Sequence, residues 1–183
     1  IYSNKMISEF KFFSELNFFL KNNESFVVYK KPSHNKIVCH QGDVISGQID
    51  EIDNNKGFLF MPFDLNKDGY FLKPKITTET KFHLKVNNKR TNEISIKEFS
   101  SKKSSYIKFI NETIDNIHSS ELEKVVCSSV FNVKLNSESC IEYFKKLIQL
   151  NHDAFCYLFY HPDTGVWIGA SPEKLLNLNN NVV

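Results

Sequence analysis

Apolar and polar residues alternate over short runs in the first half of the chain, and turn residues separate these runs. Such a pattern is typical of β-strands. It predicts strands at residues 25–30, 36–40, 57–63, 70–72 and 81–86. The polar stretch 41–56 is interpreted as a loop with uncertain strand content. A helix capped by Ser3 is predicted before the first strand, with an apolar face formed by Met6, Phe10, Phe13 and Leu20.

In the second half of the chain, apolar residues recur mainly at the three- to four-residue spacing of helices instead of alternating with polar ones. Residues 87–105 are rich in Lys and Ser and are interpreted as a linker or exposed crossover. Two amphipathic helices are predicted after it, one carried by Ile107, Ile110, Ile114 and Ile117, the other by Ile141, Phe144 and Ile148. Residues 123–135 predict the longest strand, and residues 155–161 and 166–170 predict a last hairpin. This order indicates an α+β fold with a mostly antiparallel sheet and packed helices.

The charge composition of the chain bears on the kinds of ligand that it could bind. The 183 residues carry 23 basic and 21 acidic side chains, for a formal charge of +2, without a basic stripe. Nucleic acid is therefore not an expected partner. Arg90 is the only arginine in the sequence, although arginine is the usual clamp for carboxylate or phosphate. A clamp for an anionic ligand would use lysine and backbone, or would lie outside this chain.

The cysteines and histidines follow no metal-binding pattern. The four cysteines form no C-x-x-C pair, and the six histidines are scattered. We therefore expect reduced thiols, no metal ligands in this chain, and a cytoplasmic protein. No apolar run reaches the roughly 18–20 residues that a membrane span needs, and the first residues lack the order of a signal peptide.

Two positions carry candidate chemistry. Small residues at Gly169, Ala170 and Ser171 allow a ligand to approach the backbone, and Pro172 stiffens the corner just before Glu173. A rigid corner that presents a carboxylate suits a general acid. The alternative is an ordinary turn with a solvated glutamate.

Lys124 is the second position. Alternation along the strand predicted at 123–135 places it on one face with Val126, Ser128 and Val130. Such a setting favours the neutral amine, which can accept a proton from water and act as a general base. The alternative is a lysine at a strand end that extends its ammonium to solvent.

These two motifs together resemble the chorismate-utilising enzymes. Glu-Lys-Val-Val-Cys-Ser at 123–128 and Gly-Ala-Ser-Pro-Glu at 169–173 stand in that family's order and near its spacing. The resemblance is strongest over 122–176. Residues 26–32 and 57–63 are similar to the N-terminal part of menaquinone-type isochorismate synthases. The resemblance to this family implies an anthranilate/isochorismate synthase-like fold. Residues 1–183 would then be the N-terminal part of a single domain whose C-terminal half is absent.

The resemblance also implies an activity. Isochorismate and salicylate synthases have lysine at the position of Lys124, whereas anthranilate synthases typically have glutamine and use ammonia. Lys124 would activate water, Glu173 would protonate the departing 4-hydroxyl of chorismate, and Gly169, Ala170 and Ser171 would contact substrate. Mg²⁺ would be the cofactor, with its ligands in the missing half. The product would supply menaquinone or siderophore biosynthesis.

Alternatives to this function follow from the departures. Ser129 stands where the family motif has arginine. The chain could be a salicylate synthase, which shares both residues, or a catalytically inert fragment or binding module. The final residues look like the start of a strand without its partner, so self-association of the chain is expected.

Overall fold

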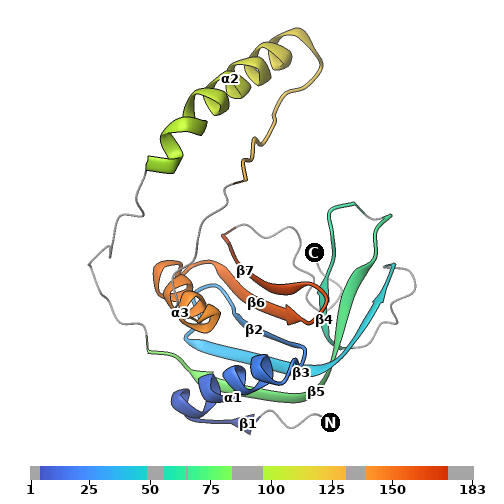
Figure 1. Cartoon of the computed structure of the whole chain (residues 1–183), viewed down its shortest axis with the longest axis vertical. Helices are drawn as coiled ribbons and strands as arrows, with labels where there is room; N and C mark the ends of the chain where they lie inside the picture. Colours follow the sequence, from blue (N-terminus) through green and yellow to red (C-terminus); the bar gives the residue numbers. More distant parts are fainter. Residues whose placement is uncertain (1–4, 49–55, 65, 84–96, 131–138, 173–183) are drawn as a thin grey trace. The chain divides into compact units, whose positions relative to one another are not determined.

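The computed structural model describes residues 5–48, 56–64, 66–83, 97–130 and 139–172 (Figure 1). The chain divides into two compact units. The first contains residues 1–86 and 137–183, and the second contains residues 87–136.

The first unit is built on a seven-stranded sheet, in the order β1-β5-β3-β2-β6-β7, with β4 paired to β5 beside this path. The strands are β1 (Lys5–Met6), β2 (Phe26–Lys30), β3 (Lys36–Gly47), β4 (Phe58–Phe60), β5 (Gly69–Lys81), β6 (Phe155–His161) and β7 (Gly165–Ser171). Only β1 and β5 pair in parallel among the described strands. The predicted α+β fold with a mostly antiparallel sheet is confirmed.

Several strand predictions differ from the structure in length. The strand predicted at 57–63 is β4, which covers only Phe58–Phe60, and the strand predicted at 70–72 is part of β5, which extends from Gly69 to Lys81. The loop interpreted from residue 41 is strand as far as Gly47, because β3 continues across a bulge at Gln41/Gly42 and pairs with β5. The strand predicted at 81–86 is wrong for Phe82 and His83, since β5 ends at Lys81. Residues 84–86 lie outside the described part.

The first helix, α1 (Glu9–Lys21), begins later than the sequence predicts. Its cap is Ser8, whose Oγ accepts a hydrogen bond from the Lys11 amide, whereas Ser3 lies outside the described residues. The buried face is formed by Phe12, Phe13, Leu16 and Phe19. Phe10 is 85% exposed, so its assignment to the apolar face was wrong.

The second helix of this unit, α3 (Cys140–Leu150), follows its prediction closely. Ser139 caps it, and Ile141, Phe144 and Ile148 are fully buried, as their helical spacing predicts. Both α1 and α3 pack on one face of the sheet (Figure 1), where their side chains join those of β2, β3 and β6 in a single core. A smaller cluster on the other face contains Val27, Leu72 and Phe159.

A buried lysine ties the α3–β6 connection to the sheet. Lys30 has no exposed surface, and its Nζ donates to the backbone oxygens of His152, at 2.6 Å, and Lys31, at 3.2 Å. Burial lowers the pKa of this ammonium. The two carbonyls supply the partners that a buried charge requires.

The second unit contains α2 (Lys97–Ser119) and the segment after it. The helix starts inside the stretch interpreted as a linker, because residues 97–105 contain no glycine or proline to end it. Residues 122–130 form no strand, so the strand prediction is wrong for that part. Instead, the segment contacts α2, where Tyr106 Oη donates to the Cys127 oxygen at 3.5 Å. Residues 131–135 lie outside the described part.

None of the helices within the described ranges is long and apolar enough to cross a membrane.

Candidate functional site

The predicted corner lies at the end of the β6–β7 hairpin. Residues 165–171 pair antiparallel with 155–161, and Gly165 adopts the positive φ of 70° that the turn requires. Gly169 and Ala170 are half-buried near the end of β7, Ser171 is its last residue, and Pro172 forms a bend. The predicted strand and corner are confirmed as far as Pro172. Glu173 lies outside the described residues, so its role as the acid stays a prediction.

Gly169 is required by packing across the hairpin. It pairs with Tyr157, and a Cβ at this position would lie 2.6 Å from Cε1 of the Tyr157 ring. Side-chain carbons do not approach each other this closely. The sequence suggested a small residue here for a ligand, and the structure shows that a neighbouring aromatic ring already uses the space. Substrate contact by Gly169, Ala170 and Ser171 remains a prediction.

Gly169→Ala is expected to destabilise the fold by about 1–3 kcal/mol, because the added methyl group must displace the Tyr157 ring. Urea unfolding followed by circular dichroism measures the change. In a Tyr157→Leu background the same substitution should cost much less, since the ring is gone. An equal cost in both backgrounds would show that Gly169 is needed for another reason.

Lys124 lies in the second unit, on the segment that follows α2. It is exposed, and the two valines predicted to shield it are exposed as well, Val126 by 82% and Val130 by 79%. The shielding that alternation predicted is therefore absent from the described part of this unit. Lys124 belongs to the second unit and the corner at 169–172 belongs to the first. The acid–base pair of Lys124 and Glu173 therefore stays a prediction.

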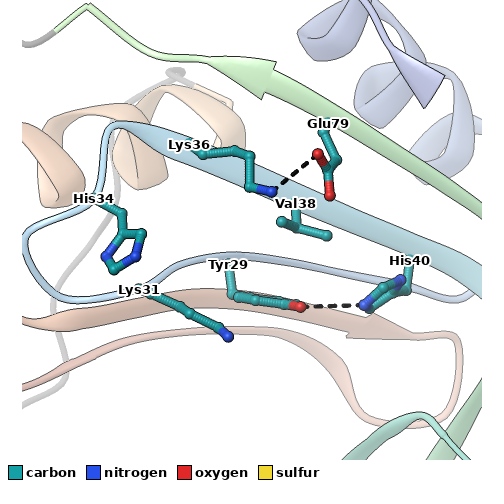
Figure 2. A pocket seen from close by; sticks show the side chains of 7 residues that line it. All are labelled: Tyr29, Lys31, His34, Lys36, Val38, His40 and Glu79. Carbon is teal, nitrogen blue, oxygen red and sulfur yellow. Dashed lines mark hydrogen bonds and ion pairs between the residues drawn. The ribbon is translucent and has the colours of Figure 1, made fainter. Parts of the chain in front are cut away.

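A hollow of about 320 Å³ opens on the sheet face opposite α1 and α3 (Figure 2). Its lining comes from the β2–β3 hairpin and from β5. The lining residues are Tyr29, Lys31, His34, Lys36, Val38, His40 and Glu79. Residues 36, 38 and 40 share one face of β3, and Glu79 stands opposite Val38 in the sheet register.

A chain of hydrogen bonds forms one wall of the hollow. Tyr29 Oη lies 3.2 Å from His40 Nε2, and His40 Nδ1 lies 2.8 Å from Thr77 Oγ1. Burial lowers the pKa of His40, against the opposing effect of Glu79, and burial raises the pKa of Tyr29. The Nε2 atom of a neutral imidazole can then accept a hydrogen bond from the Tyr29 hydroxyl group, while its Nδ1–H donates a hydrogen bond to Thr77 Oγ1. Glu79 is paired with Lys36 at 3.1 Å.

The lowered pKa of His40 predicts a loss of stability in acid. Because the folded state binds this proton less readily than the unfolded state, stability falls as pH drops below the ordinary value of 6.5. His40→Gln should therefore show a smaller drop in Tm between pH 7 and pH 5 than the unsubstituted chain. The exposed His118 of α2 provides the control, since His118→Gln should leave the drop unchanged. A parallel drop in the His40→Gln variant would contradict the assignment.

Sequence reasoning missed this hollow. The strands at 25–30 and 36–40 were predicted, and alternation along each of them places Tyr29 and His40 on definite faces. The sequence pattern does not give the register between β3 and β5, which places Glu79 opposite Val38 and Thr77 opposite His40. A hairpin with alternating polar residues on one face was the available signal.

The described residues offer no group of three or more His, Cys, Asp or Glu side chains that could hold a metal ion. All four cysteines are free thiols.

Comparison with known protein families identifies a match for this chain. Residues 63–183, about two thirds of the chain, match the family model described as chorismate binding enzyme. The match includes the positions of both Lys124 and Glu173. Neither the curated proteins nor the solved structures gave a match.

Proposed function

Because the chain belongs to the family of chorismate binding enzymes, we propose that its protein is an isochorismate synthase, which converts chorismate to isochorismate. The observation that carries the proposal is the residue at position 124. The lysine at this position and the Gly-Ala-Ser-Pro-Glu at 169–173 together resemble the pattern of the water-using members of the family. Glutamine would have favoured an ammonia-using member.

Lys124 acts as the general base in this proposal. Its neutral amine removes a proton from a water molecule, and the resulting nucleophile adds at C2 of the ring. Lys124 is exposed in its own unit, so its neutral form requires cover from substrate or from other parts of the protein. Desolvation on substrate binding is the step that would make the amine a base.

Glu173 acts as the general acid. It protonates the 4-hydroxyl group, which leaves as water while the ring double bonds shift. One water molecule is therefore added and one released, so the reaction is an isomerisation. The β6–β7 hairpin supports this role, because it is paired along its whole length and is followed by Pro172.

Mg²⁺ is the proposed cofactor, where it would neutralise the substrate carboxylates. The described residues contain no cluster that fits this ion, so we assign no residue of this chain to it and no step through it.

The test is chorismate turnover with Mg²⁺, with the products separated by chromatography. It is run on this chain and on any longer product of the same gene. Isochorismate as the product supports the proposal. Salicylate and pyruvate would identify a salicylate synthase, and anthranilate formation with ammonia would overturn the assignment from Lys124. No turnover by either protein would leave a chorismate-binding fold without this chemistry.

A further inference from the structure

The outer face of α1 carries two exposed phenylalanines. Phe10 is 85% exposed and Phe18 is 56% exposed. Ser14, which is exposed as well, lies midway between them, and residues spaced by four lie along one side of a helix. The two rings are therefore about 12 Å apart along the helix axis. A row of apolar side chains on the exposed side of a helix indicates an interaction surface.

A groove beside this row gives the surface a concave side. The groove lies between α1 and α3 and has a volume of about 370 Å³. Lys145 of α3 is in its lining, where its Nζ pairs with Glu142 at 2.7 Å and lies 4.3 Å from the centre of the Phe13 ring. The other lining residues belong to α1 and are Glu9, Phe10, Phe13, Ser14 and Asn17. A ring that enters the groove therefore meets two phenylalanines and a lysine whose charge is already paired.

The polar side chains of this surface are already bonded within α1. Ser14 Oγ donates to the backbone oxygen of Phe10 at 2.9 Å, and the amide nitrogen of Asn17 donates to the backbone oxygen of Phe13 at 3.0 Å. Covering these donors with another molecule costs less than covering donors that depend on water. The surface can therefore be buried although it is not wholly apolar.

The row is symmetric about Ser14, so a second copy of this chain is the partner that fits it. When two α1 helices pack antiparallel with their Ser14 residues at a twofold axis, Phe10 of each copy lies opposite Phe18 of the other. Such a contact uses the same patch on both copies and closes as a dimer. Because serine is small, the two helices can approach each other closely at the axis.

The charges at the two ends of α1 also favour an antiparallel pair. The helix has Glu9 in its first turn and Lys21 in its last turn. Antiparallel packing places the last turn of one helix beside the first turn of its partner, so each Lys21 lies near a Glu9. The two helix dipoles also oppose each other. A parallel pair would instead bring like charges together at both ends.

We propose that the row of Phe10, Ser14 and Phe18, with the adjoining groove, is a homodimer interface in which two α1 helices pack antiparallel. It involves neither a strand edge nor the residues of the proposed reaction. Each of the four rings buries at most about 150–250 Å², so the interface is small, below about 1,200 Å², and the dimer is weak. We expect a dissociation constant above about 10 µM. Unfolding experiments at lower concentration therefore report the monomer.

Sedimentation velocity of the purified chain, from about 5 to 500 µM, measures the dimer. The chain should change from monomer to dimer over this range. Phe10→Ser and Phe18→Ser should each weaken association at least tenfold. Ile45→Ser is the matched control, because it removes an apolar side chain of β3 that is similarly exposed, and it should change association less than twofold. Circular dichroism verifies that each variant is folded.

Exchange of the two charges tests the antiparallel direction. Lys21→Glu should weaken association at least threefold, because it places two glutamates together at each end of the interface. Addition of Glu9→Lys to this variant should restore association to within twofold of the unsubstituted chain.

Three outcomes would overturn the proposal. The first is a monomer at every concentration. The second is a dimer that Phe10→Ser and Ile45→Ser affect equally, because the contact would then lie elsewhere or be non-specific. The third is a double charge exchange that restores nothing, because the two helices would then not be antiparallel.

Discussion

Replacement of Lys124 by alanine is expected to lower the rate of isochorismate formation by about 10²–10⁴-fold, the usual contribution of a general acid or base. The loss should appear in kcat and not in KM, because the amine acts on water and not on the bound ring. Chromatography of the products formed from chorismate and Mg²⁺, at several substrate concentrations, measures both constants. The protein to use is the longest product of the gene that turns over chorismate.

Lys108→Ala is the matched control, since Lys108 is an exposed lysine of α2 in the same unit. It should retain the rate within about twofold, as surface substitutions usually have small effects. Retention of the rate by both variants would remove Lys124 from the mechanism. A loss confined to KM would make Lys124 a substrate-binding residue.

Glu173→Gln provides an independent check on the same pair. If Lys124 and Glu173 act in one step, the double variant should be no slower than the slower single variant, because groups that work as a unit are not additive. Additive losses in log kcat would indicate that the two residues serve separate steps.

The elements that sequence reasoning predicted well are those determined by local pattern. Helix α3 has a serine cap and three apolar residues at helical spacing, and all three are buried. The β6–β7 hairpin has turn residues between two apolar runs, and its register extends from Phe155 to Ser171. The residues that form each of these patterns lie close together in the sequence. Each element can therefore be predicted without knowledge of a distant strand or helix that packs against it.

The errors arise where a distant partner decides the outcome. Helix α1 has phenylalanine at positions 10, 12, 13, 18 and 19, so almost any face of it looks apolar. Its packing against the sheet buries Phe12 and leaves Phe10 exposed. Residues 123–130 have the alternation of a strand, but alternation supplies no ladder partner, and this segment contacts α2 instead. Tertiary contacts override the local pattern in both cases.

The candidate functional residues also divide into those that local sequence motifs indicate and those that depend on strand pairing. The sequence indicated Lys124 and Glu173 through motifs that resemble one family, and the family is confirmed by the match over residues 63–183. The hollow at Tyr29, in contrast, depends on the pairing of β3 with β5, which brings Thr77 and Glu79 beside His40 and Val38. A single sequence does not contain that register.

Phe144→Ala is expected to destabilise the first unit by about 3–5 kcal/mol, which is the range for removal of a fully buried aromatic ring. Phe144 lies at the centre of the apolar face of α3, between Ile141 and Ile148, and it belongs to the core that joins α1, α3 and the sheet. The ring leaves a cavity that neighbours in β6 and α1 cannot fill without moving.

Urea unfolding monitored by far-UV circular dichroism measures the change in the free energy of unfolding. Phe10→Ala removes the same side chain from the exposed side of α1 and should change that free energy by less than about 0.5 kcal/mol. The comparison tests the orientation of both helices at once, because exchanged faces would reverse the two results. Similar losses for the two variants would mean that another surface covers Phe10 in solution, as in the self-association expected from the sequence.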